Sequence, residues 1–98
     1  MSKKEKIEVN GATVPVFKYI ENGTVCYEFD TSKLGPPEPM VNALSVLKLL
    51  NNQNEMVVMI NHSKPVGLFD KITDKYTYEV EQFGDKYKIT FKLKDVKK

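Results

Sequence analysis

Alternating apolar and polar residues predict β-strands along most of this chain. In 24–31 and in 86–94 every second residue is apolar, which is typical of a strand with one face in a core and the other in water. In 6–9, Ile7 and Val9 alternate with Glu8. The apolar residues of 13–20 and the turn that joins 76–83 to the last strand predict strands there as well, so we expect five strands in these segments.

Short polar pairs separate these strands. Asn10-Gly11 and Asn22-Gly23 are the residue pairs that two-residue hairpin turns favour, because both central positions need a positive φ. Gly84-Asp85 separates the last two strands in the same way. The first thirty residues thus read as a three-stranded meander, and the last twenty as a closing hairpin.

Two segments carry apolar residues at helical spacing instead. The first is 37–50, ended by Asn51-Asn52, and the second is 65–75. Their apolar stripes are Met40, Ala43, Leu44, Leu47 and Leu50 in the first segment, and Leu68, Phe69 and Ile72 in the second. Gly67 weakens the second helix.

Between the helices lies an unbroken apolar run, 56–60. Such a run favours a central strand covered on both faces, or nearly so. Strand, helix and strand form a βαβ unit, so 56–60 should lie parallel to 24–31. The predicted order ββ-βαβαββ is an α+β fold, an α/β two-layer sandwich with a mixed sheet and two helices on one face.

Length and composition limit the number of domains and the kinds of protein that the chain can be. The 98 residues suit one domain with a 6–23 hairpin extension, a 24–95 core and tails at 1–5 and 96–98. One cysteine excludes an internal disulfide. The net charge is +2, and every cation is lysine, which lacks the planar fork that reads bases. With no long apolar run and no signal peptide pattern, we expect a cytoplasmic protein without membrane contact.

Three prolines, Pro36, Pro37 and Pro39, lie where the chain passes from the third strand into the first turn of the first helix. They fix φ and remove backbone donors, so we expect a rigid corner, here called the proline corner (36–39). The 61–65 turn follows the parallel strand, and both should meet at the carboxyl edge of the sheet, where ligands bind. The candidate binding residues are Pro36, Pro37, Glu38, Pro39, His62, Lys64 and Pro65.

The corner also resembles a known family. Asp30, Leu34, Pro36, Pro37, Glu38 and Pro39 match the spacing of the Asp, Leu and Cys-Pro-x-Pro corner of the SirA/TusA-like superfamily. The resemblance covers 25–94 and implies a βαβαββ sandwich. Pro36 stands where those sulfur carriers hold their cysteine, so the chain is more similar to a cysteine-free branch described as a domain of unknown function. Some members of that branch have a histidine where this chain has Ser63, one residue after His62.

The proline corner holds no side chain that could act as a catalytic nucleophile. Pro36 has no acidic proton, and Cys26 lies within a strand, facing away from Val25, Tyr27 and Phe29. His62 with Asp30, Glu38 or Asp70 has no spacing that selects a metal geometry. We therefore expect no enzyme activity, no metal and no cofactor.

Three functions remain from the sequence. The first is a non-catalytic module that binds a partner protein or small ligand at the proline corner. The second is single-stranded RNA binding through Lys86, Lys88, Lys92 and Lys94, with tyrosines 76, 78 and 87 as stacking surfaces, unless Glu79 and Glu81 cancel the lysines. The third is redox or sulfur relay through Cys26. The chain is expected as a monomer, or as a dimer paired through the edge of the N-terminal hairpin.

Overall fold

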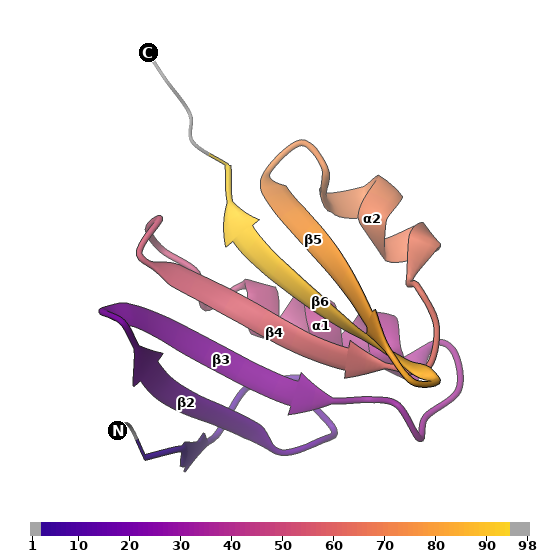
Figure 1. Cartoon of the computed structure of the whole chain (residues 1–98), viewed down its shortest axis with the longest axis horizontal. Helices are drawn as coiled ribbons and strands as arrows, with labels where there is room; N and C mark the ends of the chain where they lie inside the picture. The colour runs from indigo at the N-terminus through magenta and orange to yellow at the C-terminus, as the bar shows by residue number, and fades with distance from the viewer. Residues whose placement is uncertain (1–2, 95–98) are drawn as a thin grey trace.

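The computed structural model describes residues 3–94, which form one six-stranded sheet with two helices (Figure 1). The order ββ-βαβαββ is confirmed, and with it the α+β class. The elements are β1 (Glu5–Ile7), β2 (Val16–Glu21), β3 (Thr24–Asp30), α1 (Glu38–Leu47), β4 (Glu55–Asn61), α2 (Val66–Ile72), β5 (Tyr76–Phe83) and β6 (Lys86–Leu93). The predicted tail 96–98 lies outside the described residues, and the first strand begins at Glu5, inside the predicted 1–5 tail.

The sheet is mixed, with the strand order β1-β2-β3-β4-β6-β5. β3 and β4 are parallel, as predicted, with Cys26 opposite Met56 and Glu28 opposite Val58. All other neighbouring strands are antiparallel. The parallel pair brings the ends of β3 and β4 to the same edge of the sheet.

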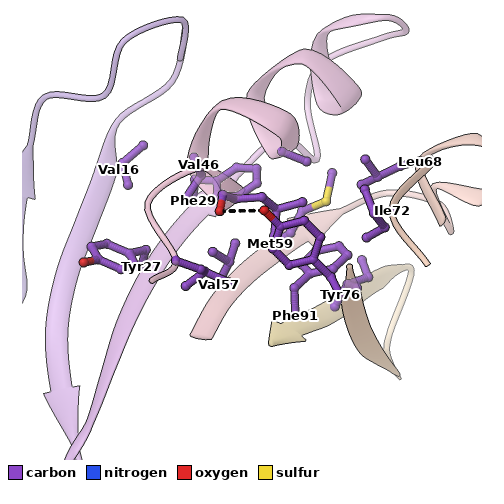
Figure 2. Close-up of a cluster of buried hydrophobic side chains, with 14 of the residues drawn as sticks. Val16, Tyr27, Phe29, Val46, Val57, Met59, Leu68, Ile72, Tyr76 and Phe91 are labelled. Carbon is purple, nitrogen blue, oxygen red and sulfur yellow. Dashed lines mark hydrogen bonds between the residues drawn. The ribbon is translucent and has the colours of Figure 1, made fainter. Parts of the chain in front are cut away.

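Both helices pack on one face, because their buried residues share a single core with one alternating set of strand residues. Figure 2 shows Val46 of α1 and Leu68 and Ile72 of α2 gathered around Phe29, Met59 and Phe91 of the sheet. Fully burying a side chain of this size contributes about 1.5–3 kcal/mol. The Tyr76 hydroxyl donates to the carbonyl oxygen of Leu47 at 3.2 Å, so this buried polar atom is satisfied.

The helices leave the other side of the sheet, here called the open face, without a covering layer. The apolar run in β4 was expected to be covered on both faces or nearly so. On the open face its coverage comes from neighbouring strand side chains: Val58 is only 4% exposed, whereas Met56 and Ile60 are half-buried. The architecture is therefore two layers.

Two of the three predicted two-residue hairpin connections are confirmed. Glu21 pairs with Thr24 across Asn22 (φ 54°) and Gly23 (φ 82°), the positive values that a type I′ turn requires. Phe83 pairs with Lys86 across Gly84-Asp85.

Asn10-Gly11 forms a turn, in which the Ala12 N–H donates to Val9 O at 3.1 Å, but the prediction that this turn closes the first hairpin is wrong. Ile7 pairs with Val16, so 8–15 is a loop rather than a two-residue turn. The backbone N–H groups of Thr13 (2.7 Å) and Val14 (3.3 Å) donate to Oδ1 of Asn42 in α1 instead of to a strand. Gly11 (φ 93°) fits against the helix because a Cβ there would lie 2.6 Å from Ser45 Oγ.

The helices are shorter than predicted. α1 ends at Leu47 rather than Leu50, and α2 covers 66–72 rather than 65–75. A tighter turn continues each helix, closed by Leu49 N to Val46 O (3.0 Å) and Lys75 N to Ile72 O (3.0 Å).

We expect Asn42→Ala to lower the free energy of unfolding by about 2–3 kcal/mol, because it leaves the Thr13 and Val14 N–H groups without an acceptor. Asn42 is fully buried and its amide also donates to Thr13 Oγ1 (2.9 Å) and Glu38 O (3.0 Å). Urea unfolding measures the change, with Lys48→Ala, at the exposed position directly after the same helix, as the control. Equal stability of the two variants would contradict this role.

Candidate functional site

The proline corner and the 61–65 turn lie side by side at one edge of the sheet. They are joined at their base by two buried polar residues, Thr31 after β3 and Asn61 at the end of β4. Thr31 Oγ1 lies 2.9 Å from Asn61 Oδ1, and the Thr31 N–H donates to Ile60 O at 2.8 Å. The Asn61 amide in turn donates to Ser63 O at 3.0 Å. This network fixes the two segments relative to each other.

A cavity of about 310 Å³ opens between the two segments and the starts of both helices. We call it the proline pocket; Pro36, Pro37, Pro39, Met40, Asn61, His62, Ser63, Lys64, Pro65, Gly67 and Leu68 line it. Most of this lining is apolar, with polar groups from the 61–64 segment on one side. Its size is at the lower end of the range for small-molecule sites.

Six of the seven candidate residues predicted from the sequence line this pocket: Pro36, Pro37, Pro39, His62, Lys64 and Pro65. Glu38 does not. Its carboxylate accepts a hydrogen bond from Thr13 Oγ1 at 2.8 Å, so it faces the 8–15 loop. The expectation that Glu38 and His62 face one site is corrected, because the first turn of α1 directs neighbouring side chains to different sides.

The prolines shape the pocket through their backbone positions. Pro37 precedes the first residue of α1, and Pro39 is buried within the first turn. The Pro36–Pro37 peptide bond is cis. Neither ring nitrogen of Pro36 or Pro37 carries a hydrogen, so this wall of the pocket offers carbon surface rather than donors.

The polar side of the pocket is formed by His62 and Lys64, both exposed. The Lys64 ammonium lies 5.9 Å from the ring centroid of Tyr87 on β6, a cation–π contact. This contact places one positive charge on the polar side of the pocket.

Sequence reasoning missed several lining residues. Met40 and Leu68 were expected in the core, because helical periodicity does not separate core positions from pocket positions at a helix start. Gly67 was read only as a helix-weakening residue. In the structure it leaves room beside Met40, since a Cβ at Gly67 would lie 3.4 Å from Met40 Cε.

No nucleophile of the sulfur-carrier type faces the pocket. Cys26 lies on the open face, directly opposite Tyr19 of β2, as alternation predicted. It is 1% exposed, and burial, reinforced by the nearby Glu21 carboxylate, raises the pKa of its thiol. A raised pKa lowers the thiolate fraction at neutral pH, which opposes sulfur transfer.

The acidic residues named above as possible metal ligands do not form a cluster with His62. Within residues 3–94 no group of three or more His, Cys, Asp or Glu side chains is placed to hold a metal ion. Asp30 accepts the Ser32 N–H at 2.8 Å. Burial opposes its ionisation, but the Ser32 hydrogen bonds together with Lys86 and Lys33 outweigh that effect and lower its pKa.

The lysine-rich strand presents its cations on the open face, with Glu81 opposite Lys88 as predicted. The tyrosines proposed as stacking surfaces lie on the helix side instead, because they alternate with the lysines. Tyr78, for example, stacks on Phe69 of α2 with ring centroids 3.7 Å apart. The expected combination of these lysines and tyrosines on one surface is therefore wrong.

No helix in the described part of the chain is long and apolar enough to cross a membrane. Comparisons with known proteins return no match: neither a protein-family model, nor a curated protein, nor a solved structure resembles the chain significantly.

We expect Cys26 to react with iodoacetamide at least about 100-fold more slowly in the folded protein than in urea, because its thiol is buried and protonated at neutral pH. Mass spectrometry of quenched samples gives both rates, and the unfolded chain serves as the reference for an accessible thiol. Labelling of the folded protein at the unfolded rate would instead support a reactive cysteine.

Proposed function

We propose that this protein is a non-catalytic binding module whose proline pocket takes an apolar group from a partner protein or a small ligand. We further propose that it is a cysteine-free relative of the SirA/TusA-like superfamily. The element order and the corner residues Asp30, Leu34 and Pro36 support that relationship. The proposal of function does not depend on it.

The observation that carries the proposal is the meeting of two distant segments around one cavity. The proline corner and the 61–65 turn are separated by α1 and β4, yet together they line the same 310 Å³. Pre-formed apolar pockets with a few polar groups are the usual form of a ligand site. The Thr31–Asn61 contact supports a pre-formed pocket, because it is buried and independent of any ligand.

The chemistry of the lining indicates the kind of group that fits. Proline rings, Met40 and Leu68 favour an aliphatic or aromatic side chain, while His62 and Lys64 favour a polar or anionic group beside it. Pro36 supplies no nucleophile, so the expected event at this site is binding without turnover.

We expect Gly67→Leu to weaken binding while leaving the fold intact, because the new side chain extends from α2 into the pocket. Replacing glycine in a helix itself favours the helix by about 0.5–1 kcal/mol, and the flexible Met40 side chain can move aside. Lys71→Leu, the same new side chain at an exposed α2 position outside the lining, is the matched control.

The immobilised protein and both variants are incubated with native extract, and retained proteins and small molecules are identified by mass spectrometry. Each retained species is then titrated into the free protein while the Met40 methyl NMR signal is followed. Wild type and Lys71→Leu should bind it, and Gly67→Leu should lose at least about tenfold in affinity. Equal binding by Gly67→Leu, with its fold confirmed by circular dichroism, would show that the pocket is not the site.

A further inference from the structure

The open face of the sheet has a charge pattern that is complementary to itself. Its central row is Met56, Val58 and Ile60 of β4, which lie between β3 and β6 in the strand order. The β3 side carries Glu28 and Asp30, and the β6 side carries Lys86, Lys88 and Lys92. An apolar row thus separates an acidic strand from a basic one.

The register aligns these groups. Asp30, Ile60 and Lys88 form one row across the three strands, and Glu28, Val58 and Thr90 form the next. In the described part of the chain, the one ion pair within 4.0 Å joins Lys4 to Glu28 at 3.2 Å, so the β6 lysines have no carboxylate that close. Glu81 of β5 lies opposite Lys88 in the sheet but forms no ion pair with it within 4.0 Å, so the Lys88 ammonium can contact a partner surface.

We propose that the open face binds a second copy of this chain, with the two-fold axis parallel to the strands and centred on β4. Such an axis reverses the order of the strands between the two copies but leaves the position of each residue row along the strands unchanged. β4 then stacks on β4 of the partner, and the acidic β3 of each copy lies over the basic β6 of the other. Asp30 of one copy faces Lys88 of the second, and this contact occurs twice.

The charges select this axis over the alternative. A two-fold axis in the plane but perpendicular to the strands would place β3 on β3 and β6 on β6. Glu28 of one copy would then face Glu28 of the other, and Lys88 of one copy would face Lys92 of the other, so like charges would repel. Pairing through the β5 edge has the same defect, because an antiparallel β5 pair sets Glu79 and Glu81 against each other.

The size of the face predicts a weak, reversible dimer. Strand spacing of about 4.8 Å and a rise of about 3.3 Å per residue give the five longer strands a face of roughly 20 by 23 Å. Two such faces together span about 920 Å², which is below the roughly 1,200 Å² at which stable specific interfaces begin. The dimer should therefore form in the micromolar range or above, and it should weaken with salt.

The test exchanges the charges of one contact between copies. Asp30→Lys alone sets lysine against Lys88, and Lys88→Glu alone sets glutamate against Asp30, so each variant should dimerise at least about tenfold more weakly than wild type. An equimolar mixture should recover the wild-type affinity to within about threefold, because both contacts of the mixed dimer pair opposite charges. Sedimentation velocity from about 1 μM to about 1 mM covers the range.

Lys48→Glu, directly after α1, and Asp70→Lys, on α2, change exposed positions away from the open face; they are the matched controls and should leave dimerisation unchanged. Circular dichroism establishes that each variant is folded, and Met56→Lys on the central row provides a second disruptive change independent of Asp30. A wild type that stays monomeric at about 1 mM overturns the proposal. So do single variants that dimerise normally, as an edge-paired dimer would, or a mixture that does not recover.

Discussion

The parallel pairing of β3 and β4 is the constraint on which the arrangement of this protein depends. Parallel strands end at the same edge, so the segments that follow them must meet there. In this chain those segments are the proline corner and the 61–65 turn, and the buried contact between Thr31 and Asn61 joins them. The direction of the strands therefore determines where the proline pocket lies, and the side chains determine only what lines it.

The same register also determines what lies on the helix-free side. Alternation sends Tyr27, Phe29, Val57 and Met59 to the helices, and it sends Glu28 and Val58 to the open face. β4 is apolar on both sides. One side packs against α1, and the other is shielded by side chains of the neighbouring strands. An unbroken apolar strand can thus lie in a sheet that helices cover on one face only, provided that side chains of the flanking strands shield its other face.

The elements of the fold were predictable because their signals are local. Alternation located the strands of 24–31 and 86–94, helical spacing located α1, and the βαβ order gave the parallel pair. The 8–15 loop was not predictable, because its backbone binds Asn42, a residue that is distant in sequence and lies outside the apolar stripe that predicted its helix. The pocket was predicted from topology, but Glu38 was misplaced, since its direction depends on the same loop through Thr13.

The position of β6 has a consequence for how the sheet assembles. β6 follows β5 in the chain but lies between β4 and β5 in the sheet. During synthesis the ribosome releases β4 well before its permanent neighbour, and until residues 86–93 arrive one side of β4 has no hydrogen-bonding strand. Until then the most apolar strand of the protein has an unpaired edge, the kind of edge at which incomplete chains pair with one another and aggregate.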